Sequence, residues 1–79
     1  MKKILLSALK RGESAVICGI AAPKKLKKRL EEMGMTKGVK IVCALESPFG
    51  GAKAYEIRGT KIAVGKEEGE KILAEMENG

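Results

Sequence analysis

Apolar residues recur at every second position in two segments of this chain, which indicates strands. The run ESAVICGI, from Glu13 to Ile20, is rich in β-branched residues and follows Gly12, as expected for a strand that begins after a turn. The run VKIVCALE, from Val39 to Glu46, alternates more regularly. Its apolar face is predicted to carry Val39, Ile41, Cys43 and Leu45.

Two further β-prone runs predict a hairpin. KAYEIR, from Lys53 to Arg58, and TKIAV, from Thr60 to Val64, are separated by Gly59, and glycine adopts the positive φ angles that tight hairpin turns require. The stretch SPFGG, residues 47–51, precedes this hairpin and combines a proline with two glycines. It is therefore predicted to be a turn.

A period of 3.6 residues appears in two other places and predicts helices. Pro23 suits a first helical turn, and Leu26, Leu30 and Met33 then form one apolar stripe that Gly34 would end. Near the C-terminus, Glu67 and Glu68 favour a helix start. The apolar face of that closing helix is predicted to consist of Gly69, Ile72, Leu73 and Met76.

These elements predict a mostly β protein with two helices and four or five short strands. Closing so small a sheet into a partly open barrel would hide its edges. The length of 79 residues fits a single domain over residues 1–79. The apolar run near the N-terminus is shorter than that of a secretory signal. A cytoplasmic location is therefore expected.

Composition argues against catalysis and against a metal centre. The chain has no His, and its two cysteines, Cys18 and Cys43, form no CxxC pair, so the usual general base and the usual zinc motif are both missing. No phosphate-binding glycine motif is present either. We therefore expect no enzyme activity, small-molecule substrate, cofactor or tight iron site, and we expect both cysteines to be small buried residues.

Four motifs in order resemble the ferrous iron transport protein A family (FeoA-like). They are LxxLxxG at residues 6–12, RLEEMGMTKG at 29–38, SPFGG at 47–51 and EIRGTKIAV at 56–64. The resemblance extends from about Leu6 to Met76. It implies an SH3-like fold and a cytosolic protein that acts on a membrane ferrous iron permease, ferrous iron transport protein B, which has a cytosolic GTP-binding domain.

Phe49 is the one phenylalanine of the chain, and two interpretations of it stay open. Its ring can fold back over a thin core, as large aromatic side chains usually do. Alternatively, Pro48 and Phe49 form an apolar patch with Tyr55 nearby that binds a partner protein.

The run KKLKKR, residues 24–29, carries five positive charges in six positions of the first helix. Lys27 and Lys28 can pair with Glu31 and Glu32, which would make this an ordinary solvated surface. As a contact surface, Lys24, Lys25 and Lys28 would instead attract an acidic protein or, peripherally, an anionic membrane. The formal net charge of +6 also suits nucleic acid.

The nucleic-acid alternative is disfavoured because the chain has only one Phe and one Tyr for base stacking. The main hypothesis is thus an accessory protein that binds and modulates the permease. A small basic nucleic-acid-binding barrel and a metal-responsive regulatory domain are the alternatives. Self-association stays open.

Overall fold

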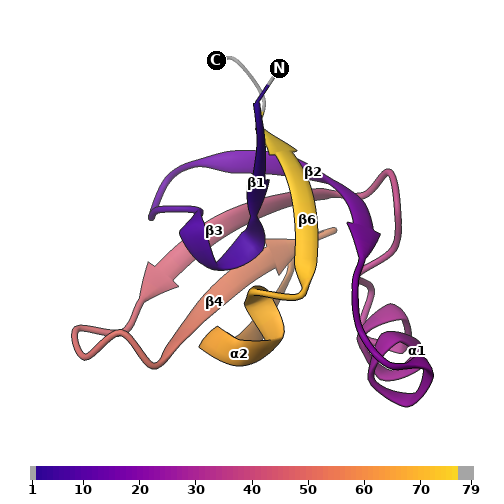
Figure 1. The fold of residues 1–79 in the computed structure, drawn as a ribbon. Coiled ribbons are helices and arrows are strands. Elements are labelled where there is room, and N and C mark those ends of the chain that lie inside the picture. Colours follow the sequence, from indigo (N-terminus) through magenta and orange to yellow (C-terminus); the bar gives the residue numbers. More distant parts are fainter. Residues whose placement is uncertain (1, 77–79) are drawn as a thin grey trace.

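The protein is built on one antiparallel sheet that curls around its core. The computed structural model describes residues 2–76, and Met1 and residues 77–79 lie outside the described part. The elements in chain order are β1 (Lys3–Leu5), the 3-10 turn η1 (Leu6–Ala8), β2 (Ser14–Ile20), α1 (Lys24–Glu32), β3 (Lys40–Glu46), β4 (Ala52–Ile57), β5 (Thr60–Gly65), α2 (Lys66–Gly69) and β6 (Ile72–Met76). The strands are ordered β1-β6-β2-β3-β4-β5, and the two helices lie at one end of the curled sheet (Figure 1). The predicted mostly β architecture is confirmed.

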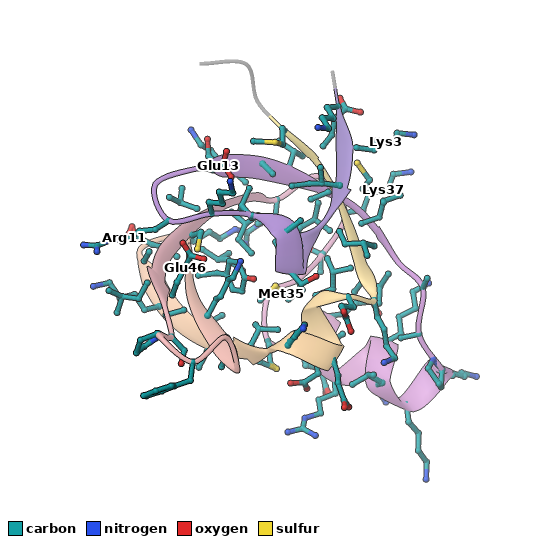
Figure 2. All side chains as sticks on the ribbon, turned by 60° about the vertical axis from the view of Figure 1, so that its left-hand side comes forward. Lys3, Arg11, Glu13, Met35, Lys37 and Glu46 are labelled. Carbon is teal, nitrogen blue, oxygen red and sulfur yellow. The ribbon has the colours of Figure 1, made fainter. Side chains whose placement is uncertain are left out.

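The core lies on the concave face of the sheet. There, the inward-pointing side chains at alternate strand positions pack against the turn η1 and helix α1. Met35, which follows α1, lies at the centre of the molecule (Figure 2). Apart from the hydroxyl of Tyr55, no polar or charged side chain among residues 2–76 is buried. The largest fully buried side chains are Tyr55, Leu6, Leu9, Ile17, Leu30, Met35, Ile41, Ile72, Val64 and Cys43.

Helix α1 and the β4–β5 hairpin form where the sequence predicts them. Gly34 has a φ of +106°, and this left-handed residue lets the Met35 N–H donate to the Leu30 carbonyl oxygen at 3.0 Å, which ends α1. Arg58 and Gly59 have φ values of 51° and 82°. These are the positive angles of a two-residue hairpin turn, whose twist matches that of the flanking strands.

A bulge in β3 moves Leu45 to the outer face, and in β2 the inner face carries Ala15 and Ile17 and not Cys18. The β3–β4 register shifts between Cys43 and Leu45, so Cys43 is buried, as expected, but Leu45 is 51% exposed. The β2–β6 register shifts between Ile17 and Gly19. Cys18 lies at this shift and is only half-buried, so the expectation that both cysteines are buried is wrong for Cys18.

The predicted closing helix is wrong beyond its first turn. Helix α2 ends at Gly69, and Ile72–Met76 forms β6 instead. Strand β6 pairs with β1 on one side and with β2 on the other. Because both neighbours supply main-chain hydrogen bonds, this tertiary pairing outweighs the helical spacing of the apolar residues. Neither helix in the described part has the length and apolar character that crossing a bilayer requires.

Candidate functional site

The loop between β3 and β4 is a hydrogen-bonded turn that presents Phe49 to solvent. The Gly50 N–H donates to the Ser47 carbonyl oxygen, and the Ser47 N–H donates to that of Ala52, both at 3.1 Å. Gly50 has a φ of +73°, which glycine adopts without strain. Phe49 is 95% exposed, so the interpretation that its ring folds back over the core is wrong. Pro48 is exposed beside it.

Tyr55 belongs to the core and not to an exposed patch with Phe49. It is 1% exposed, and its hydroxyl donates to the Leu6 carbonyl oxygen at 3.1 Å. Burial raises the pKa of this hydroxyl, so it stays protonated and remains a donor. The expected grouping of Tyr55 with the loop residues on the surface is therefore wrong, because inward-pointing positions of β4 face the turn η1.

A cleft of about 280 Å³ lies next to the Phe49 loop. Its walls combine the apolar side chains of Tyr55 and Val64 with the charged side chains of Glu46, Lys53 and Lys66. Gly50, Gly51 and Ala52 form its rim on the loop side, and Ser7 of η1 also lines it. An exposed aromatic ring beside a small, partly apolar cleft can contact a partner through both features.

Lys53 organises one wall of this cleft. Its Nζ donates to the carbonyl oxygens of Ser7 and Leu9, each at 2.7 Å, and lies 3.4 Å from Glu46 Oε1. The carbonyl groups at the end of a helical turn have no N–H donor within that turn. Lys53 thus supplies the hydrogen-bond donor for these groups of η1. The sequence analysis missed Lys53. The signal was its spacing of two residues from Tyr55, which places both side chains on the inner face of a strand.

Glu46 connects the cleft to the turn that precedes β2. Its Oε2 accepts the Arg11 main-chain N–H at 2.9 Å. This hydrogen bond, together with that from the Lys53 side chain, lowers the pKa of the Glu46 carboxyl group. The Arg11 side chain points away from the molecule (Figure 2). Glu46 therefore acts as an acceptor for the turn, and Arg11 is left as an outward-facing positive charge.

The predicted basic contact residues Lys24, Lys25 and Lys28 are all exposed on α1. Within residues 2–76 no ion pair joins Glu31 or Glu32 to a lysine of α1, so the expected pairing within the helix is not formed. In Figure 1, α1 and the β3–β4 loop lie at opposite sides of the molecule. The structure thus separates the predicted contact residues into two surfaces, the Phe49 loop and the basic helix.

Thiol and carboxylate groups do not assemble into a metal centre in the described residues. No group of three or more Cys, Asp or Glu side chains between positions 2 and 76 lies close enough to hold an ion. Burial raises the pKa of the Cys43 thiol, and a protonated thiol is a poor metal ligand. Cys18 donates weakly to the Val16 carbonyl oxygen at 3.6 Å.

Comparison with known proteins places this arrangement among related domains. A family model described as the FeoA domain matches residues 4–76, whereas no curated protein matches the sequence. The FeoA-like protein from Clostridium acetobutylicum has 26% identity and a TM-score of 0.86, over 96% of this chain and 88% of its own. FeoA from Stenotrophomonas maltophilia, a zinc complex described as an SH3 domain protein, has 25% identity and a TM-score of 0.79, over 91% and 89%.

A third structure, an iron uptake regulatory protein (FeoA), shares 21% identity with a TM-score of 0.87, over 95% of this chain and 99% of its own. At this identity the likeness bears on the fold alone. The three alignments each include nearly the whole of both chains. The expected SH3-like fold is therefore confirmed.

Proposed function

The chain belongs to the FeoA domain family, and because this family is associated with ferrous iron transport we propose that it binds and modulates a membrane ferrous iron permease. The contact would be made with the cytosolic part of the permease, which carries a GTP-binding domain. The protein would accordingly work in the cytoplasm, without an enzyme activity of its own. The S. maltophilia relative is described as a candidate ferrous iron transport activating factor, which supports a role through a partner.

The observation that carries this proposal is the exposure of Phe49. A ring that is 95% exposed contributes almost nothing to the stability of the free protein, because it buries almost no apolar surface. The hydrogen-bonded turn fixes the main chain at Phe49 before binding, so little main-chain conformational entropy is lost when a partner covers the ring. Aromatic residues, phenylalanine included, are enriched at the centres of protein–protein interfaces.

The basic helix has a second and different role in the proposal. Lys24, Lys25 and Lys28 are exposed and form no ion pair with residues 2–76, so they attract an acidic surface over long range. Because α1 lies away from the Phe49 loop, its charges would act through long-range attraction, which raises the association rate and its dependence on salt. The Phe49 loop is therefore proposed to determine affinity, and the basic helix to speed encounter.

The test is a calorimetric titration against the isolated GTP-binding cytosolic part of the permease, with and without guanine nucleotide. Phe49→Ala should weaken binding by about thirtyfold, which corresponds to the ~2 kcal/mol of an interface hot spot. Its unfolding free energy should change by no more than about 0.5 kcal/mol. Leu5→Ala is the matched control, since Leu5 is a 44% exposed apolar residue of β1 that belongs neither to the Phe49 loop nor to the lining of the cleft.

Three results would count against the proposal. Wild-type protein that does not bind the permease fragment would contradict the choice of partner. Equal binding by Phe49→Ala and Leu5→Ala would remove the loop from the contact. Binding to a random-sequence oligonucleotide alone, with steep loss as salt increases, would favour the nucleic-acid alternative.

A further inference from the structure

The two edges of the sheet differ in how they are protected. The β1 edge is only three residues long and begins at Lys3, and short, charged edges resist pairing with other chains. The β5 edge is six residues long. Its register with β4 is unbroken from Thr60 to Gly65, whereas bulges interrupt the β2–β6 and β3–β4 pairings. Strand β5 contains no proline, so Lys61 is the one charged side chain along an otherwise regular edge.

The register identifies the main-chain groups that β5 directs away from β4. Ile57 and Thr60 flank the two-residue turn and are directly opposite each other, and such a pair exchanges hydrogen bonds in this type of hairpin. The Lys66 N–H donates to the Gly51 carbonyl oxygen at 2.9 Å. Every second residue from Thr60 to Lys66 therefore directs its main-chain groups toward β4, and the residues between them direct theirs away.

By this alternation, the N–H and C=O groups of Lys61 and Ala63 point outward. Both residues are exposed, and these four groups have no hydrogen-bond partner within residues 2–76. Gly65 is the third outward position, but its N–H already donates to the Glu68 carboxylate at 3.3 Å. The available edge is therefore centred on Ile62.

The side chains of this edge determine which residue types would fit in a strand paired with β5. Ile62 packs against the core but stays partly exposed at the edge, so an apolar residue placed beside it would complete its burial. Val64 is on the same inner face. Lys61 points to the outer face and is exposed, and an acidic residue directly opposite would form a favourable cross-strand pair.

We propose that the β5 edge binds an extended segment of a partner protein by antiparallel strand addition. The segment has the pattern apolar, any residue, apolar, acidic, placed opposite Val64, Ala63, Ile62 and Lys61 in turn. Antiparallel pairing continues the pattern of the whole sheet and is the slightly more stable arrangement. This mode of recognition takes affinity from main-chain hydrogen bonds and specificity from alternate side chains.

A partner with an acidic residue fits this edge better than a second copy of the chain. A symmetric pair centred on Ile62 would place Lys61 opposite Ala63, so the second copy would add no acidic residue beside the lysine, whose acidic neighbour is Glu56 on β4. It would also bring together two chains that each carry a formal charge of +6, and this charge opposes association. The proposed edge does not depend on the identity of the permease.

The probe for this edge is the synthetic peptide acetyl-Ser-Val-Thr-Val-Glu-Thr-Ser-amide, followed by NMR titration of the full chain. The amide signals of Lys61 and Ala63 should shift and their hydrogen exchange should slow. Ala63→Pro removes one outward N–H that β4 does not use, and prolines are tolerated at such edge positions. The affinity of the Ala63→Pro variant for the peptide should fall about tenfold. The control Ala63→Val keeps the N–H, and its affinity should stay within about twofold of wild type.

A charge exchange tests the predicted register. Lys61→Glu should weaken binding of the glutamate peptide by about two- to fivefold, and a peptide with lysine at that position should restore it. This arm remains decisive if Ala63→Pro fails to fold. The proposal would be overturned if the peptide changed amide chemical shifts only outside β5, or if both Ala63 variants bound it equally. It would also be overturned if the lysine peptide failed to restore binding to Lys61→Glu. So would a wild-type dimer in sedimentation equilibrium that Ala63→Pro converts to a monomer, because the occupant would then be a second copy.

Discussion

Replacing Lys53 by methionine should destabilise the fold by about 3 kcal/mol. The Nζ of Lys53 donates to the carbonyl oxygens of Ser7 and Leu9 at 2.7 Å, and hydrogen bonds from charged donors contribute about 1.5–3 kcal/mol each. Lys53 is 20% exposed, so water can reach part of this site and the lower end of that range applies to both bonds. Methionine keeps most of the apolar stem, so packing changes little.

The assay is urea unfolding followed by circular dichroism at 25 °C, with a thermal melt beside it. For a domain of this size, ~3 kcal/mol corresponds to a decrease in Tm of roughly 12–24 °C. Lys61→Met is the matched control, because Lys61 is an exposed lysine on the neighbouring strand, and its unfolding free energy should change by no more than about 0.5 kcal/mol. The loss caused by Lys53→Met should persist in a Glu46→Gln background, since the carbonyl contacts do not involve Glu46.

A result that would refute the reasoning is a loss below about 1 kcal/mol with an unchanged dependence on urea. It would mean that water satisfies the two carbonyl groups as well as the ammonium does. A loss that disappears in the Glu46→Gln background would assign the effect to the ion pair instead.

Three other changes have defined outcomes. Tyr55→Phe removes the donor to the Leu6 carbonyl oxygen and should lower the unfolding free energy by about 1–2 kcal/mol in urea; unchanged stability would mean that Leu6 finds another donor. The pKa of Glu46 is lowered in the folded state, so its contribution is complete above the ordinary glutamate pKa and is lost as pH falls through the lowered value. Stability of Glu46→Gln should therefore fall less steeply than that of wild type between neutral and acid pH, and parallel curves would contradict this. Gly69→Ala would place a Cβ 3.3 Å from the Ser7 N and Cβ atoms and should lower Tm despite a helix-propensity gain of ~1 kcal/mol; a higher Tm would show that Ser7 moves aside.

Local patterns in the sequence determine β2, β3, α1 and the hairpin, and these elements are where they were predicted. Their signals act over a few residues, as when Gly34 ends α1 or Gly59 closes the turn. Residues 67–76 behave differently, because Ile72 and its apolar neighbours fit both a helical period and a strand that is apolar on two faces. Contacts with β1 and β2, far away in the sequence, decide between these structures, and single-sequence patterns do not contain that information.

The candidate site was predictable only in part for the same reason. The turn at residues 47–51 followed from its proline and glycines, but whether Phe49 points inward or outward depends on the rest of the fold. The cleft depends on Lys53 reaching Ser7, a residue 46 positions earlier. The buried position of Tyr55 likewise depends on the approach of η1, which nothing near Tyr55 in the sequence indicates.

The position of β6 has a consequence for how the chain reaches its folded state. This strand comes last in the chain but lies between β1 and β2, where it pairs Ile4 and Ile17 with Ala74. During synthesis, the first two strands therefore leave the ribosome long before the strand that joins them. Pairings between such distant segments slow folding, and until β6 arrives the inner edge of β2 is open to pairing with other nascent chains. The sheet can thus be completed only after residues 72–76 are synthesised, because β6 is the strand that joins β1 to β2.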